Sequence, residues 1–193
     1  MTRKPKKWIL IGVGILAVFI GLAVTWIIAP PLESSLLASS PTSSAPIINE
    51  ISCDSMEHFN MHIHAHLDIF IAGNPYTVPS EVGIIPKQCI YWMHTHDDTG
   101  IIHIESPTNR TFTLGEFFDI WGEKFDNNQI FDNIVGEGGG NNNNTLNVHI
   151  NGNGINNSTD YREVKINAHD EIVIVFGTSP DLIPKTYKFP EGL

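Results

Sequence analysis

Apolar and polar residues alternate along most of the chain from Ile51 onward, and this pattern predicts strands with one face toward a core. The clearest alternation covers residues 61–71, MHIHAHLDIFI. Because neighbouring side chains on a strand point to opposite faces, this strand has one apolar face and one histidine face. Residues 76–79 can pair back on it as a short strand, and residues 89–96 and 100–106 predict a hairpin.

Three more strands are predicted in the C-terminal half, over residues 146–150, 161–166 and 171–177. The last of these is almost wholly apolar, which is typical of a strand in the middle of a sheet with both faces buried. Residues 136–144, GEGGGNNNN, are too polar and too rich in glycine to contribute to a core, and they predict an exposed loop.

One helix is predicted over residues 113–121. Thr113 and Glu116 match a capping box, apolar residues then recur at helical spacing up to Trp121, and Gly122 follows as a stop. Together these elements predict a β-rich α+β fold, a compact sheet or partly open barrel with one packed helix, preceded by a single transmembrane helix.

The N-terminal segment carries the predicted transmembrane helix. Residues 8–29 form an uncharged apolar stretch of 22 residues, about 33 Å long as a helix and therefore long enough to span a bilayer. The basic tail, residues 1–7, predicts a cytoplasmic N-terminus, and the Pro- and Ser-rich residues 30–50 predict a linker. Residues 51–193 would then be a domain outside the cell membrane. A cleavable signal peptide is the alternative, although its apolar region is usually shorter, roughly 7–15 residues.

The predicted domain is acidic. From Ile51 onward the chain has 19 acidic and 7 basic residues, a formal charge near −12. Nucleic-acid binding needs clustered lysine and arginine, so this balance argues against a nucleic-acid partner. An acidic surface instead attracts cations.

Cys53 and Cys89 both lie in the domain predicted to be exported, where disulfides persist. They lack the Cys-x-x-Cys spacing of common thiolate metal sites, so a disulfide between them is predicted rather than two ligands.

The histidines carry the strongest chemical signal. All nine lie in the predicted domain, and six form two groups in the sequence. Two histidines at positions i and i+2 of a strand share a face, so His-x-His presents two imidazoles to one ion. The predicted ligands are His64, His66, His94, His96 and His103, with His62, Asp68 and Asp97 as further ligands or as acceptors that orient imidazole N–H groups.

The register of the predicted hairpin brings some of these predicted ligands together. A loop of two or four residues centred on Asp98 and Thr99 pairs His94 with His103, so that His94, His96 and His103 converge with Glu105 farther along the same face. A three-residue loop would break this register. Whether the histidines of residues 62–66 join them depends on strand order, which the pattern leaves open.

Three sequence stretches, HIHAHLDIF, YWMHTHDDTGIIHIESP and FTLGEFFDIWG, resemble an uncharacterised family of membrane-anchored, histidine-rich exported proteins of archaea and bacteria. The resemblance covers roughly residues 62–121 and implies no activity. The His-x-His pair with a third histidine is also similar to cupins and to alpha-type carbonic anhydrases. The cupin pattern has a glutamate and then a glycine after the pair, whereas residues 97–100 read DDTG here, and the segments that surround a carbonic anhydrase site are missing. Neither activity is carried over.

Three functions follow from these observations. The first is a membrane-anchored domain outside the cytoplasm that holds zinc or copper through clustered histidines. The second is a metal-dependent enzyme of hydratase or hydrolase type, with three histidines on the ion and Glu105 as a possible general base. The third is a structural or interaction domain that binds no metal and whose histidines respond to pH.

Overall fold

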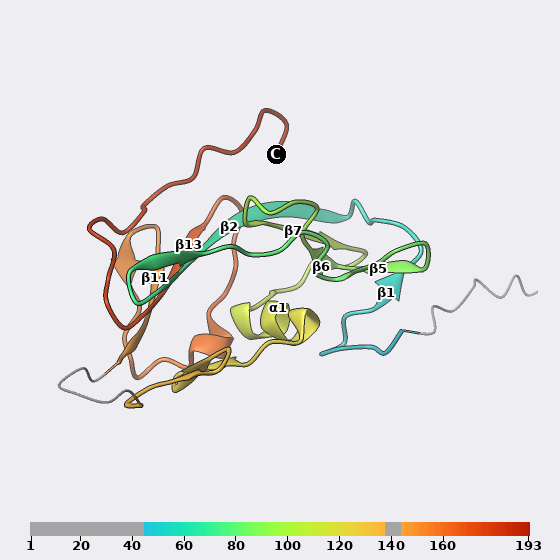
Figure 1. Cartoon of the computed structure of the whole chain (residues 1–193). Coiled ribbons are helices and arrows are strands. Elements are labelled where there is room, and N and C mark those ends of the chain that lie inside the picture. Colours follow the sequence, from blue (N-terminus) through green and yellow to red (C-terminus); the bar gives the residue numbers. More distant parts are fainter. Residues whose placement is uncertain (1–44, 138–143) are drawn as a thin grey trace, which may run out of the picture. The chain divides into compact units, whose positions relative to one another are not determined.

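The longest strand, β2 (Met61–Ile71), organises the fold in the computed structural model of the chain, which describes residues 45–137 and 144–193 (Figure 1). These residues fall within one compact unit. Within them, seven strands form the main sheet, in the order β12-β11-β13-β2-β7-β6 with β3 also paired to β2. The other strands of this sheet are β3 (Asn74–Tyr76), β6 (Met93–His94), β7 (Ile101–Ser106), β11 (Leu146–Ile150), β12 (Asn153–Gly154) and β13 (Glu171–Phe176).

The two long strands β2 and β13 run parallel, and the other pairings of the main sheet are antiparallel. The strand β13 lies between β11 and β2, and all its residues are buried, so the prediction of a central strand is confirmed. The short return strand is also present, two residues earlier than predicted. The sheets do not close into a barrel, so the open-sheet form of the predicted fold holds.

Two small sheets complete the described part of the chain. One joins β1 (Cys53–Asp54), β5 (Cys89–Tyr91) and β4 (Ile84–Ile85), and its neighbouring strands β1 and β5 carry the two cysteines. The predicted disulfide between Cys53 and Cys89 is confirmed. The other small sheet is a meander of β8 (Phe125–Asp126), β9 (Gln129–Ile130) and β10 (Asn133–Ile134).

The predicted helix is present as α1 (Leu114–Trp121), and the predicted cap is formed. The Thr113 amide donates to Glu116 Oε2 over 2.9 Å. At the other end Gly122 takes a left-handed φ of 81°, and its amide donates to the Phe118 carbonyl oxygen, so glycine suits the position where the helix stops. Figure 1 shows α1 against one face of the main sheet, with the C-terminal segment crossing the other face.

The apolar face of β2 lies on the helix side. Ala65, Leu67 and Ile69 are buried in the same core cluster as Phe117 and Phe118 of the helix. Each fully buried Leu, Ile or Phe side chain contributes about 1.5–3 kcal/mol relative to exposure. This burial fixes which face of β2 points to the core and therefore leaves the histidines on the opposite face.

The predicted strand over residues 161–166 is wrong. Tyr161–Glu163 instead form a 3-10 helix, η1, which Asp160 begins by accepting a hydrogen bond from the Arg162 amide over 2.9 Å. The segment after it still hydrogen-bonds as an extended chain, because the Ile166 amide donates to Phe112 and the Leu114 amide donates to Val164. The apolar residues of this segment are therefore buried against the start of α1. The alternating pattern of residues 161–166 reflects this burial, although the segment is not a strand of a sheet.

The predicted tail, transmembrane helix and most of the linker, residues 1–7, 8–29 and 30–44, lie outside the described residues. Over residues 45–137 and 144–193, no helix has the length and apolar character needed to cross a membrane. The last part of the predicted linker contacts the domain, since Tyr91 donates through its hydroxyl to the Pro46 carbonyl oxygen over 2.7 Å.

Removing the disulfide should destabilise the domain, because the bond closes a loop between residues separated by 36 positions and restricts the unfolded chain. For the double variant Cys53→Ser/Cys89→Ser we expect a free energy of unfolding lower by about 2–4 kcal/mol, measured by urea denaturation at pH 7.5. Reduced wild-type protein serves as the control and should match the variant. A difference below about 0.5 kcal/mol would show that the bond does not contribute to stability.

Candidate metal centre

Three neighbouring strands bring histidines to one face of the main sheet. On β7, His103 lies directly opposite His64 of β2 and directly opposite His94 of β6. The predicted pairing of His94 with His103 is therefore confirmed, although the connection between β6 and β7 is longer than the predicted tight turn. The partner of Glu105 on β2 is His62. The two histidine groups of the sequence meet in one place, because β2 pairs with β7.

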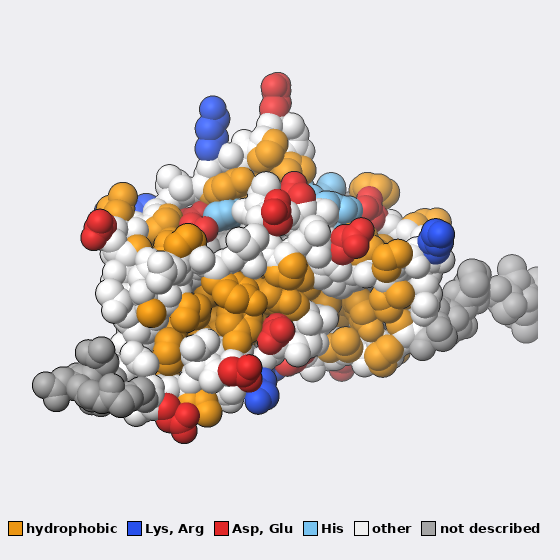
Figure 2. Space-filling model, in the orientation of Figure 1, with side chains coloured by type: hydrophobic (Ala, Val, Ile, Leu, Met, Phe, Trp, Pro, Cys, Tyr) orange, Lys and Arg blue, Asp and Glu red, His pale blue; other side chains and the backbone are white. Residues whose placement is uncertain are grey.

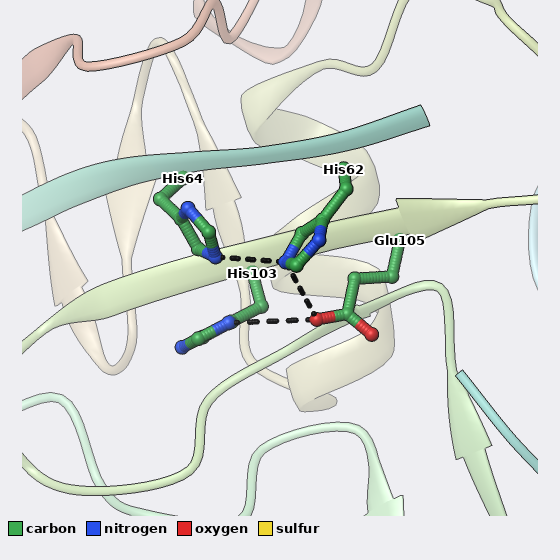
Figure 3. A group of neighbouring side chains, drawn as sticks. All are labelled: His62, His64, His103 and Glu105. Carbon is green, nitrogen blue, oxygen red and sulfur yellow. Dashed lines mark hydrogen bonds and ion pairs between the residues drawn. The ribbon is translucent and has the colours of Figure 1, made fainter. Parts of the chain in front are cut away.

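The imidazoles lie at distances that suit metal ligands. His62 Nε2 and His64 Nε2 are 3.1 Å apart, and His94 Nε2 and His96 Nε2 are 3.2 Å apart. Two nitrogens bound about 2.05 Å from one tetrahedral ion would be separated by about 3.3 Å. Figure 3 shows the β2 histidines pointing toward His103 and Glu105 of β7. Donor atoms within 4.8 Å of one another form two groups, which share His103 and Glu105: His62, His64, His103 and Glu105, and His94, His96, His103 and Glu105.

Glu105 belongs to both groups and contacts two of their histidines. Its Oε1 is 3.2 Å from His62 Nε2 and 3.7 Å from His103 Nδ1. The other oxygen, Oε2, and His103 Nδ1 are both buried and have no hydrogen-bond partner among the described residues. The two residues are only 3% and 9% exposed. Buried polar atoms without partners are costly, so these two atoms are expected to have a ligand in the functional protein.

The backbone around His94 orients its ring. His94 Nδ1 lies 2.9 Å from the Tyr91 carbonyl oxygen, which can only accept, so Nδ1 carries the proton and Nε2 keeps its lone pair for an ion. The next residue, Thr95, is buried and accepts a hydrogen bond from the Val82 amide. Gly83, at φ 75°, lies so close that a Cβ there would come within 2.4 Å of the Met93 carbonyl oxygen. The contacts of Val82 and Gly83 with this strand hold the His94–His96 pair in place.

One side of the cluster is open to solvent. The side chains of His62 and His96 are 37% and 45% exposed, whereas His64 and His94 are buried. Figure 2 shows histidine at the surface beside acidic side chains. Glu57 is an acidic side chain next to the cluster, since its Oε1 lies 3.6 Å from His96 Nε2. An ion can therefore reach the cluster from solvent and end beside buried imidazoles.

Burial keeps the inner histidines neutral. It lowers the pKa of His64 to about 4, with further lowering by the neighbouring His103 and His62. Burial also lowers the pKa of His94 to about 4, against the opposing hydrogen bond to Tyr91. Burial opposes the ionisation of Glu105, but its interactions with the surrounding histidines outweigh this and lower its pKa. Near pH 7, His64 and His94 are thus neutral and Glu105 is a carboxylate, and these are the protonation states that bind metal.

His66, a predicted ligand, lies in a different group. Its Nε2 is 2.8 Å from the Thr99 carbonyl oxygen, which only accepts, and its Nδ1 is 2.9 Å from Glu171 Oε2. Both ring nitrogens are thereby engaged. Burial lowers the pKa of His66, but Glu171 more than compensates, so the pKa is raised. Tyr187 of the C-terminal segment stacks on this ring at 3.7 Å between centroids.

The other predicted carboxylates, Asp68 and Asp97, do not belong to the two donor groups that share His103 and Glu105. Asp68 joins the group of His66 and Glu171. Asp97 belongs to the turn before β7, where its Oδ1 accepts from the Thr99 amide over 3.0 Å. The hydrogen bonds from Thr99 lower the pKa of Asp97. Its position is that of a turn residue.

Sequence reasoning missed two acidic neighbours of the histidines. Glu171 opens the apolar strand β13, and a charged residue at the start of a fully buried strand is a signal that could have found it. Nothing in the pattern around Glu57 indicated its approach to His96. Of the isolated histidines, His58 pairs with Asp54 over 2.8 Å, and Asp54 also accepts from Trp92.

The neutral histidines should make the metal-free domain sensitive to acid. Because His64 and His94 have a lower pKa in the folded chain than in the unfolded chain, only the unfolded chain takes up their protons between about pH 6.5 and pH 4. Stability should therefore fall as the pH drops through this window, by on the order of 2 kcal/mol per histidine at pH 5. His66, with its raised pKa, acts in the opposite direction.

Urea unfolding of chelator-treated protein at pH 7.5 and pH 5 measures this loss. The variant His64→Gln/His94→Gln should lose much less stability than wild type between the two pH values. An equal loss in both proteins would contradict the assignment of the acid sensitivity to these two rings.

Comparison of the chain with protein-family models, with curated proteins and with solved structures gives no match. The function is therefore inferred from the histidine cluster itself.

Proposed function

We propose that this protein is a metal-binding module, anchored in the cell membrane by its N-terminal segment, whose outer domain holds zinc or copper. The observation that carries the proposal is the cluster of five imidazoles and one carboxylate, in which Glu105 Oε2 and His103 Nδ1 are buried without a hydrogen-bond partner among the described residues. Hydrogen bonding among the side chains alone leaves these atoms unsatisfied. A bound cation would satisfy them.

The donor set favours Zn²⁺ or Cu²⁺. Imidazole nitrogens with one carboxylate suit both ions, and Mg²⁺ or Ca²⁺ would require mostly oxygen ligands. The cysteines offer no thiolate because they form the disulfide. Met61 and Met93 pack on the core side of their strands, away from the histidines, so the cluster has no thioether either.

Charge and location support the same proposal. The acidic domain raises the local concentration of cations near the cluster. A disulfide is typical of domains outside the cytoplasm, which agrees with an N-terminal segment predicted to cross the membrane once with the domain outside.

A metal-dependent hydratase or hydrolase is the second candidate, and the exposure of His62 and His96 favours it. Their open side would let water or a substrate reach the ion, as a catalytic centre requires. Glu105 is less suited to the role of general base, because it is buried beside the imidazoles and is itself a candidate ligand. A metal-bound water with a pKa near 7, found by titration of the Co²⁺-substituted protein, would favour the enzyme.

Metal should stabilise the protein through this cluster. For full-length chain purified in detergent under oxidising conditions, Zn²⁺ or Cu²⁺ at 100 times its dissociation constant should raise the free energy of unfolding by about 2.7 kcal/mol. The variant His64→Ala/His94→Ala/His103→Ala removes one ligand from each strand and should show no such rise. The metal content of this variant, measured by mass spectrometry, should also be lower than that of wild type.

The matched control is His149→Ala, since His149 lies on β11 outside the cluster. It should bind metal as wild type does. Circular dichroism of the metal-free proteins checks that the triple variant folds. Equal metal content and equal stabilisation in wild type and the triple variant would exclude both metal-dependent functions for this cluster.

A further inference from the structure

The cluster has more donors than one ion uses. Five imidazoles and the two oxygens of Glu105 offer seven donor atoms, whereas protein-bound zinc takes four ligands and rarely five. If a single ion were bound by one His-x-His pair, His103 and Glu105, the other His-x-His pair would bind no ion. The two pairs have nearly the same geometry, because their Nε2–Nε2 distances are 3.1 and 3.2 Å.

We propose that the cluster is a dinuclear metal centre in which Glu105 bridges two ions. This inference rests on the proposed function. One ion is held by His62 and His64 of β2, and the other by His94 and His96 at the end of β6. His103 and Glu105 lie between the pairs and belong to both donor groups. A carboxylate has two oxygens, so it can bind both ions at once.

The position of Glu105 suits this bridging role. Its Oε1 lies near His62 and His103, and its Oε2 is buried with no hydrogen-bond partner among the described residues. One oxygen therefore faces protein donors while the other has nothing to bind within the described chain. Two cations in one site also repel each other, and an anion shared between them reduces that repulsion.

The surroundings supply the remaining ligands unequally. Near the β6 pair, Glu57 Oε1 lies 3.6 Å from His96 Nε2 and can complete that ion's ligands. Near the β2 pair, His62 is partly exposed, and Phe59 lies edge-on at 6.0 Å between ring centroids. The ion on the β2 pair therefore has fewer protein ligands than the ion on the other pair. We expect it to bind more weakly and to exchange first.

The test is the number of ions bound per chain, with Zn²⁺ and Cu²⁺ as the probes. Full-length protein in detergent is loaded, passed over a desalting column and measured by mass spectrometry, with His64→Ala/His94→Ala/His103→Ala as the background. Wild type and the control His149→Ala should bind two ions above background. The variants His62→Ala/His64→Ala and His94→Ala/His96→Ala should each bind one.

Glu105→Gln separates a bridge from an ordinary ligand, since glutamine keeps the shape but loses the charge and one acceptor oxygen. Its second ion should bind at least tenfold more weakly than in wild type, while the first stays bound. In the Cu²⁺ protein, the electron paramagnetic resonance signal of wild type should integrate to less copper than is present, because neighbouring Cu²⁺ ions couple. Each pair variant should give the full signal of one isolated ion.

The outcomes separate this inference from the proposed function. One ion in wild type, retained when one of the two pairs is removed, would overturn the dinuclear centre and leave the metal-binding module intact. Two ions in wild type that both survive the loss of either pair would also overturn it. Metal no higher in wild type than in the background variant would overturn both.

Discussion

The structure depends on the register of β7 between its two neighbours. His103 lies opposite His64 on one side and His94 on the other, so three imidazoles stand in a row across strands about 4.8 Å apart. A shift of β7 by one residue would turn His103 toward the core and turn Ile102 and Ile104 toward the histidine face. The hydrophobic effect therefore sets the geometry of the histidine cluster, because the isoleucines must face α1 and the rest of the core.

The groups that could bind a cation in this cluster are also groups that weaken the metal-free fold. Burial of His64 and His94 disfavours their protonated forms, and burial of Glu105 leaves one carboxylate oxygen without a hydrogen-bond partner among the described residues. The apolar core and the disulfide provide the stability that tolerates these groups. Because the rings and the carboxylate are already oriented, a cation would bind with little rearrangement, and its binding would remove the cost of the unsatisfied atoms.

Short-range features were the most predictable part of the molecule. The cap of α1, the faces of β2 and the pairing of His94 with His103 follow from residues close in sequence. The meeting of the two histidine groups was not predictable, because it requires β2 to pair with β7 rather than with another strand. The role of His66 depends on Glu171, which lies 105 residues away. The prediction for residues 161–166 failed because periodicity records burial and does not show which hydrogen bonds accompany it.

The central claim is that the histidines of β2, β7 and β6 bind metal, and anomalous diffraction from crystals of the metal-loaded protein tests it most directly. Data collected on both sides of the zinc or copper absorption edge should place a peak about 2.0–2.2 Å from the imidazole nitrogens of this cluster. Two peaks, one at each His-x-His pair with Glu105 between them, would mark the dinuclear centre. Metal found only at other surface residues, or no peak in the cluster at saturating metal, would contradict the account.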